Sequence, residues 1–246
     1  IRPDNPFLPL DIVTTLDLGM QRALESILDR HQVGTGAAVI LDARSGDIVA
    51  MSSRPKFRPV DVHPERPDWA NRALKAAAPG SVFKLVVAAA ALEYGVVGPD
   101  ERFFCPGEWD KYGLSCWKRD GHGHVTLGEA FAGSCNVAFA QLSERLTAEQ
   151  IADTARRLGL GLTVGWEGEI DGARFRQLDG EEPGRIFADP PTAVDGGAKA
   201  QAAIGQRDVR ITPLQAANMA LAVVNRGRVV RPRAVSAVRY RNGIAL

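Results

Sequence analysis

The chain has 246 residues, of which 45% are hydrophobic and 24% charged, a composition that excludes a mostly disordered protein. Its 30 basic and 29 acidic residues leave a formal net charge of +1, so no strong positive field predicts binding to nucleic acid. The longest apolar stretch, residues 85–92, is much shorter than the roughly 20 residues of a membrane-spanning helix, so we expect no such helix in this sequence.

The first third of the chain predicts an extended segment, a helix and a hairpin. Residues 1–11 contain three prolines and favour an extended segment. A helix is expected over residues 17–31, where one helical face carries Met20, Leu24, Ile27, Leu28 and His31. Residues 36–44 and 47–52 predict two antiparallel strands joined at Ser45-Gly46, and residues 54–68, with four prolines, predict a long loop.

Helices dominate the prediction for the rest of the chain. Residues 81–94 are apolar nearly all round, which indicates a buried helix. Three capping boxes predict helices that run from Thr126 to about Leu146, from Thr147 to Gly159 and from Thr212 to Gly227. Residues 103–124 and 161–205 show no clear period, and residues 235–240 predict a strand followed by a hairpin turn at Asn242-Gly243.

Three Ser-x-x-Lys patterns occur, and a helix would place the two side chains of such a pattern on one face. Residues 53–56 contain a proline and residues 115–118 lie in an irregular stretch, so neither should be helical. Ser81 and Lys84 open the buried helix, whose N-terminus favours negative charge and whose burial would lower the lysine pKa. This pair predicts a serine nucleophile with a lysine base. The alternative is a capping serine followed by a lysine that reaches solvent.

A Ser-x-Asn pattern, Ser134 and Asn136, lies inside the helix predicted after Thr126. Residues two apart do not share a helical face, so they reach one site only if the helix ends or bends nearby. In that case the hydroxyl could relay a proton and the amide could orient a substrate peptide bond. The alternative is two small polar residues in a helix interior.

The segments PGSVFK (residues 79–84) and GSCN (residues 133–136) together resemble the motif pair of penicillin-binding transpeptidases, the superfamily that includes serine β-lactamases. Three further segments agree: TTLDLGMQRALE, DARSGDIVAM and AAIGQRDVRITPLQAANMALAVVNRGRVVRP. The segment GHGHVTLGEAFAGSCN is similar to the monofunctional, class B branch. The resemblance covers residues 14–232.

The resemblance implies an α/β fold of the α+β kind, with an antiparallel sheet flanked by helices and an all-helical subdomain. The 246 residues would form a partial transpeptidase domain that is incomplete at its C-terminus. Residues 1–80 would supply a helix and the strand hairpin, residues 81–227 a mainly helical part with the motifs, and residues 228–246 a return toward the sheet.

Carried over to this sequence, the resemblance implies that Ser81 is acylated, Lys84 is its general base, Ser134 relays protons and Asn136 binds the substrate amide. The implied reaction is peptidoglycan D,D-transpeptidation. The D-Ala-D-Ala end of one stem peptide acylates the serine, an amine of a neighbouring stem releases it, and β-lactams mimic that peptide end. No metal or organic cofactor is implied. The implied location is the outer face of the bacterial cytoplasmic membrane, through an upstream anchor, with a glycosyltransferase as a partner.

Two features depart from the family pattern. No Lys-Thr/Ser-Gly motif occurs in these 246 residues, and Arg207 stands where the family has glycine. Two other functions stay open, and the missing motif supports the first of them. One is a non-catalytic β-lactam or peptidoglycan-binding module, or an inactive homologue. The other is a D,D-carboxypeptidase or β-lactamase, against which the missing Glu-x-x-x-Asn pattern of class A enzymes argues.

The three cysteines form no Cys-x-x-Cys pair, and the four histidines are not at zinc-finger spacing from them, so the sequence predicts no structural metal. On an outer surface, Cys105 and Cys116 could form a disulfide. Cys135 is expected to be a small buried filler. His122 and His124 are expected to be structural or solvated.

Overall fold

The computed structural model describes residues 10–57, 60, 65, 69–98, 100–170, 173–188 and 190–240. The chain divides into two compact units. The first contains the described residues of 1–76, 163–183 and 212–246, and the second those of 77–162 and 184–211. The Asn242-Gly243 turn and most of the predicted extended segment lie outside the described residues.

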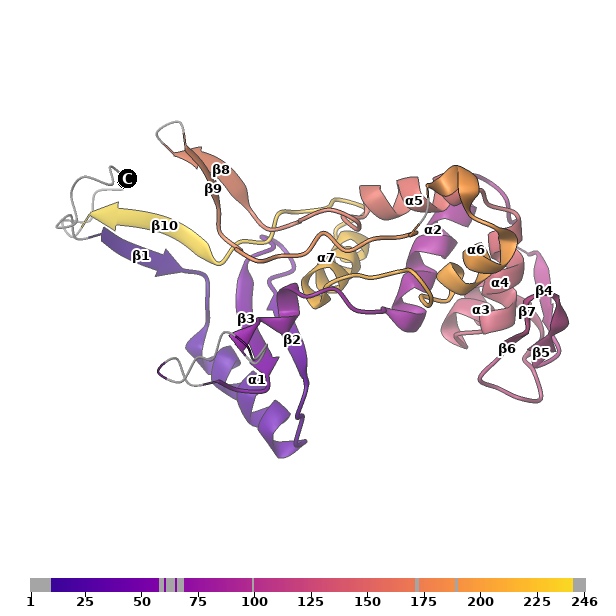
Figure 1. Ribbon diagram of the computed structural model, residues 1–246, viewed down its shortest axis with the longest axis horizontal. Coiled ribbons are helices and arrows are strands. Elements are labelled where there is room, and N and C mark those ends of the chain that lie inside the picture. Colours follow the sequence, from indigo (N-terminus) through magenta and orange to yellow (C-terminus); the bar gives the residue numbers. More distant parts are fainter. Residues whose placement is uncertain are drawn as a thin grey trace. The chain divides into compact units, whose positions relative to one another are not determined.

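The first unit combines antiparallel strand pairs with two helices (Figure 1). Its pairs are β1 (Leu10–Thr14) with β10 (Val235–Tyr240), β2 (Gly36–Leu41) with β3 (Ile48–Arg54), and β8 (Glu167–Ile170) with β9 (Ala173–Arg176). Helix α1 (Leu18–Arg30) packs on β3, and α7 (Pro213–Val224) packs on β2 and on a 3-10 turn, η2 (Arg72–Leu74). The buried cluster of this unit consists of Ile48, Leu74, Val164, Leu178 and Leu214.

The predicted hairpin and the C-terminal strand are both confirmed, but the hairpin turn is longer than Ser45-Gly46. The strands end at Leu41 and resume at Ile48, and the Asp42 carboxylate accepts hydrogen bonds from the backbone N–H groups of Arg44 (3.0 Å) and Ser45 (2.8 Å). A short acidic side chain that bonds backbone donors two and three residues on stabilises a wider loop. These local hydrogen bonds favour the longer loop over the predicted two-residue turn at Ser45-Gly46.

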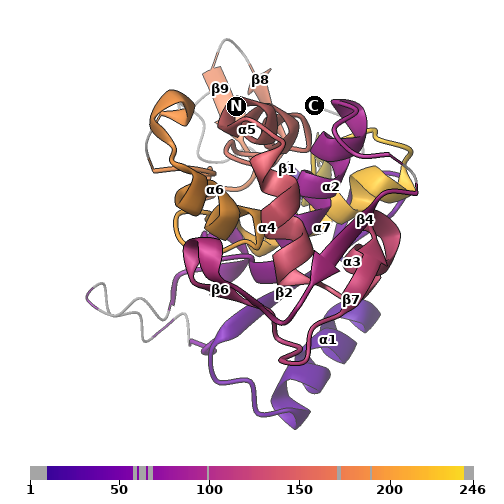
Figure 2. The ribbon, with the colours of Figure 1, turned by 90° about the vertical axis from the view of Figure 1, so that its right-hand side faces the viewer.

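The second unit is mainly helical. Its helices are α2 (Lys84–Glu93), α3 (Leu127–Ala132), α4 (Asn136–Glu144), α5 (Ala148–Arg157) and α6 (Gly196–Ala203), with 3-10 turns η3 (Gly80–Phe83), η4 (Asp110–Tyr112) and η5 (Pro191–Ala193). Helix α4 packs against both α2 and α6 (Figure 2). Helix α2 buries Val86, Val87, Ala90 and Ala91, as its apolar sequence predicts.

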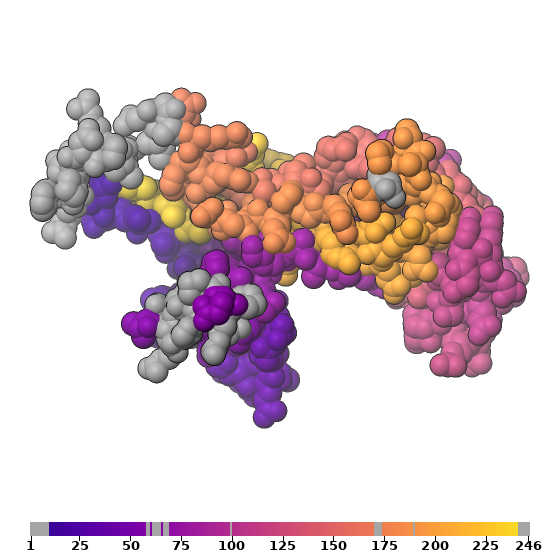
Figure 3. Space-filling view, viewed as in Figure 1, coloured from indigo at the N-terminus to yellow at the C-terminus, as the bar shows by residue number. Residues whose placement is uncertain are grey.

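The stretch without a clear period, residues 103–124, folds into short antiparallel pairs. These are β4 (Arg102–Cys105) with β7 (Gly123–Thr126), and β5 (Glu108–Trp109) with β6 (Leu114–Ser115). This segment lies at the surface of the second unit, where Figure 3 colours it magenta to pink. Strands of two to four residues are too short for alternation to appear in the sequence.

All three predicted capping boxes form, at Thr126, Thr147 and Thr212. The first helix does not run to Leu146, however, because it is interrupted between α3 and α4, at residues 133–135. Within the residues that the structure describes, no helix combines the length and the hydropathy required to cross a membrane.

Candidate active site

Ser81 lies in the first turn of a continuous helix that begins as η3 and continues as α2. The preceding residue, Gly80, has φ +58° and donates its N–H to the carbonyl oxygen of Gly205 (2.9 Å). Ser81 itself is exposed, whereas Phe83 in the same turn is fully buried. The turn is therefore anchored on one side and presents the Ser81 hydroxyl to solvent on the other.

Lys84 is only 1% exposed and its amine is surrounded by oxygen atoms. Its Nζ lies 3.2 Å from Ser81 Oγ, 2.9 Å from Ser134 Oγ, 2.7 Å from the Ser134 carbonyl oxygen and 2.8 Å from Asn136 Oδ1. Burial lowers the pKa of Lys84 below its ordinary value, and negative charge on ionised Cys116 or Cys135 would oppose that shift. A buried lysine with a lowered pKa is suited to accept a proton.

The interruption between α3 and α4 brings the Ser-x-Asn pattern to Lys84. Ser134 adopts φ +49°, a left-handed conformation that is uncommon outside glycine, and Cys135 then caps α4. The Ser134 hydroxyl donates to Ser81 Oγ (2.9 Å), and Asn136 Nδ2 donates to the Ser115 carbonyl oxygen (3.2 Å). The bend that the Ser-x-Asn hypothesis required is present, and the four predicted side chains meet.

The oxygen partners of Lys84 indicate how a proton can move. A neutral amine has two N–H donors and one lone pair. The Ser134 carbonyl and the Asn136 side-chain oxygen can only accept, and they are the two shortest contacts. Both donors are thereby occupied, and the lone pair is left for a hydroxyl proton from Ser81 or Ser134. The arrangement can thus activate Ser81 and return a proton through Ser134.

The cysteines differ from the sequence prediction. All three thiols are free and buried, so the Cys105–Cys116 disulfide is not formed in this structure. Burial raises the pKa of Cys135 to about 12. Burial also opposes ionisation of Cys116, but backbone N–H groups of Lys118 and Asn136 outweigh it and lower the pKa of that thiol.

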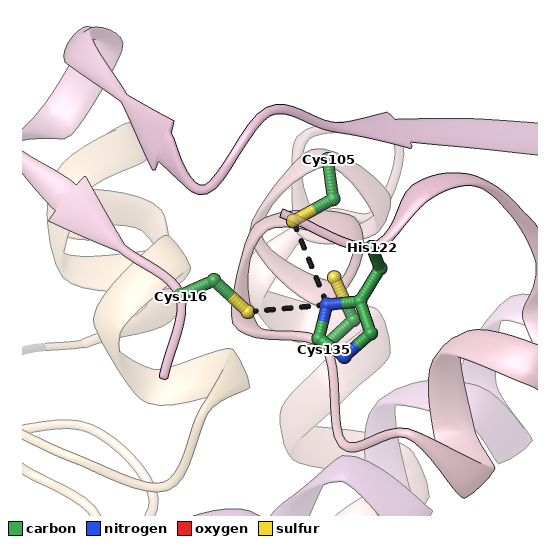
Figure 4. A group of neighbouring side chains, drawn as sticks. All are labelled: Cys105, Cys116, His122 and Cys135. Carbon is green, nitrogen blue, oxygen red and sulfur yellow. Dashed lines mark hydrogen bonds between the residues drawn. The ribbon is translucent and has the colours of Figure 1, made fainter. Parts of the chain in front are cut away.

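His122, which the sequence predicts to be structural or solvated, lies beside the cysteines in the structure. Its Nδ1 lies 3.4 Å from Cys116 Sγ and 3.7 Å from Cys105 Sγ, with Cys135 beside them (Figure 4). The sequence separations of 11, 6 and 13 residues give no metal-site signature. The signal in the sequence is that two histidines and three cysteines fall within residues 105–135. His124, by contrast, is exposed, and its ring contacts that of Phe104 at a tilt of 40°.

Arg207 stands where the family pattern has glycine. The backbone geometry at this position explains why glycine is usual there. Its φ is +56°, in the left-handed region that glycine enters without steric cost. Its carbonyl oxygen accepts a hydrogen bond from Arg210 Nη1 (2.7 Å). The arginine therefore keeps the glycine-like backbone conformation.

Comparisons with known proteins identify the family of the chain. Residues 36–243 match the family model described as the penicillin-binding protein transpeptidase domain. Stage V sporulation protein D of Bacillus subtilis is 36% identical over 234 residues, which are 91% of this chain and 34% of that protein. The chain therefore spans about a third of the length of this curated relative.

The similar solved structures include two that match 96% of the chain. One is penicillin-binding protein A of Mycobacterium tuberculosis as a ceftriaxone acyl-enzyme, with a TM-score of 0.77, 27% identity and 56% of that chain covered. The other comes from a peptidoglycan synthase complex that coordinates polymerization and crosslinking, with a TM-score of 0.76, 29% identity and 45% of that chain covered.

Proposed function

This chain belongs to the penicillin-binding protein transpeptidase family, and from that premise we propose that it is a serine D,D-transpeptidase that cross-links peptidoglycan stem peptides. The observation that carries the proposal is the contact of Lys84 Nζ with Ser81 Oγ, Ser134 Oγ and Asn136 Oδ1. Two segments about 50 residues apart, one with Ser81 and one with Ser134 and Asn136, converge on one buried amine, and the Ser81 hydroxyl is exposed. Such convergence is typical of an activated nucleophile.

The proposed reaction assigns a role to each of these side chains. Ser81 Oγ bonds to the carbonyl carbon of the penultimate D-Ala, and its proton passes to neutral Lys84. The C–N bond to the terminal D-Ala breaks, and the departing amine takes a proton through the Ser134 hydroxyl. An amine of a second stem peptide then bonds to the same carbonyl carbon, and the C–O bond to Ser81 breaks. The proton that this amine loses returns to Ser81 Oγ by way of Lys84. Asn136, held by Lys84 and Ser115, would orient the donor peptide amide.

The proposed setting follows from the substrate. Cross-linking of peptidoglycan takes place outside the cytoplasm, so we place the protein at the outer face of the cytoplasmic membrane. A glycosyltransferase that polymerises the glycan is its proposed partner. The similarity to a chain of a synthase complex that couples polymerization to crosslinking supports this partner.

Benzylpenicillin should form one covalent adduct with the folded chain, located on Ser81. The test is intact-mass measurement followed by mapping of the modified peptide, with Ser81→Ala as the variant that should carry none. Ser53→Ala is the matched control, because Ser53 also belongs to a Ser-x-x-Lys pattern. A folded chain without an adduct would contradict catalysis by these 246 residues and leave the family assignment standing. An adduct that hydrolyses rapidly would favour a carboxypeptidase or β-lactamase.

The rate of Ser81 acylation should increase with pH. Only neutral Lys84 can accept the serine proton, and burial favours the neutral form by lowering the lysine pKa below 10.5. The acylation rate should therefore rise at a lower pH than it would if the base were an exposed lysine. Single-turnover acylation by benzylpenicillin, corrected for hydrolysis of the penicillin in buffer, measures it. A rate that falls as pH rises would assign the base role elsewhere.

A further inference from the structure

A groove beside α1 and β3 lies wholly within the first unit and takes no part in the proposed reaction. It consists of two hollows of about 530 and 320 Å³, volumes that are usual for ligand sites. Residues 54–56 line both hollows, so the two adjoin along that segment. Phe57, Trp69 and Asn71 also line the larger hollow, and residues 32–34 also line the smaller one.

Two aromatic rings are exposed at the larger hollow. Phe57 is 46% exposed and Trp69 is 49% exposed. Single exposed rings are common on protein surfaces, but two rings that line one hollow are typical of a ligand site. Both rings offer a flat apolar face, so they suit a ligand that is itself built from rings with apolar faces.

The charges along the groove are balanced. Lys56 Nζ donates to Asp29 Oδ2 (2.6 Å), and the Arg54 guanidinium, which is 5% exposed, donates to Asp29 Oδ1 (2.8 Å). With Glu25, the described residues that line the groove include two acidic and two basic side chains. No excess of either sign is present among them to select an ion, so we expect a neutral ligand.

The groove is already formed without a ligand. The Arg54 guanidinium also donates to Ser52 Oγ (2.8 Å) and to the carbonyl oxygens of Ser53 (3.1 Å) and Glu25 (3.2 Å). A buried guanidinium with several fixed acceptors holds the end of β3 against α1. A ligand would therefore bind without the entropic cost of ordering this wall.

Asn71 offers a hydrogen-bond donor to a ligand. Its Oδ1 accepts from the Ala73 N–H (3.0 Å), and its Nδ2 donates to Met51 Sδ (3.1 Å). A side-chain amide has two N–H groups, and a thioether sulfur is a weak acceptor. In the described part of the chain, Asn71 thus keeps donor capacity for a carbonyl or hydroxyl oxygen.

A peptide strand is a poorer fit, because the backbone of β3 beside the groove is already paired. Gln21 Nε2 donates to the Met51 carbonyl oxygen (3.0 Å), and the Met51 N–H donates to Gln21 Oε1 (2.9 Å). The Asp17 N–H donates to the Val49 carbonyl oxygen (2.9 Å). These bonds occupy the groups by which an added strand would be recognised. The ligand should therefore be held by ring faces rather than by backbone pairing.

Sugars combine these properties. A pyranose ring carries C–H groups on its faces, which pack on aromatic rings, and hydroxyl or acetamido oxygens at its edge, which accept hydrogen bonds. A chain of such rings is neutral and can follow two adjoining hollows. We propose that the groove binds a neutral, N-acetylated oligosaccharide. That this oligosaccharide is the glycan of peptidoglycan is a consequence that rests on the proposed function.

Binding of triacetylchitotriose, a neutral trisaccharide of N-acetylglucosamine, tests the groove. The folded chain should bind it saturably in calorimetry. Trp69→Ala and Phe57→Ala should each weaken binding by about 10-fold, a usual effect of removing an aromatic contact. Phe175→Ala is the matched control, because that ring is 47% exposed on β9 of the same unit but does not line the groove. Maltotriose, which has no acetamido group, should bind about 10-fold more weakly, the contribution of one hydrogen bond.

Three results would overturn the inference. One is a folded wild-type chain that does not bind the trisaccharide. Another is equal binding by the wild type, Trp69→Ala and Phe57→Ala. The third is binding of a soluble leucine-rich hexapeptide, weakened by both substitutions, in place of the trisaccharide, which would assign the groove to a peptide. Equal binding of maltotriose would contradict recognition of the acetamido group.

The outcome for the groove can be separated from the outcome for the proposed function. The trisaccharide carries no stem peptide, and benzylpenicillin carries no sugar. A Ser81 adduct without sugar binding would therefore count against the groove alone. Sugar binding without an adduct would count against the transpeptidase alone.

Discussion

Replacement of Lys84 by methionine should slow the acylation of Ser81 by about 10²- to 10⁴-fold, the usual contribution of a general base. Methionine keeps the length and the apolar stem of lysine, so Phe83 and the apolar side of α2 should remain packed. The variant removes the one atom that contacts Ser81, Ser134 and Asn136 together. The measurement is the rate of penicilloyl-enzyme formation under single-turnover conditions.

Lys118→Met is the matched control. Lys118 also ends a Ser-x-x-Lys pattern, but its side chain is exposed. We expect that variant to acylate at the wild-type rate. Circular dichroism and thermal melting of both variants would separate a lost base from a lost fold. A folded Lys84→Met variant with undiminished acylation would show that another group takes the Ser81 proton.

The sequence indicated Ser81 and Lys84 as one cluster because their signal is local. The spacing of Ser81 and Lys84 on one helical turn follows from helix geometry, and the apolar residues after them predict the burial of the lysine. The sequence did not predict the bend at Ser134. It indicated only that Ser134 and Asn136 reach one site if the helix ends or bends nearby. Its φ of +49° depends on how the ends of α3 and α4 are held by the rest of the unit.

The fold was predictable where the sequence pattern of a helix or strand lies within that single element. The capping boxes and the apolar helix were found correctly, since each depends on residues three or four apart. The strands between residues 102 and 126 were missed, because each is too short to alternate visibly. Their arrangement depends instead on the close backbone contact between Gly107 and Gly121. The meeting of His122 with three cysteines depends on the same contact.

Alanine at Gly205 should damage both stability and acylation, although the residue touches no catalytic side chain. Gly205 follows α6 with φ +73°, and a Cβ there would lie 1.8 Å from the Gly80 carbonyl oxygen. The left-handed backbone and the overlap together should cost roughly 2–5 kcal/mol of unfolding free energy. That corresponds to a fall in melting temperature of roughly 4–20 °C.

The Gly205→Ala substitution should also slow the acylation of Ser81 by about 100-fold. Relief of the overlap moves Gly80 and, with it, Ser81. A displacement of a reacting atom by about 1 Å typically slows a reaction by this factor. Gly128→Ala is the matched control, since a Cβ there meets nothing within 4 Å and the residue lies inside α3. The Gly128→Ala substitution should leave the free energy of unfolding unchanged or raise it by up to about 1 kcal/mol. Equal melting temperatures and acylation rates for the two variants would contradict a role for Gly205 in holding the nucleophile turn. A melting temperature lowered only for Gly205→Ala, with acylation slowed at temperatures where the variant is folded, would support it.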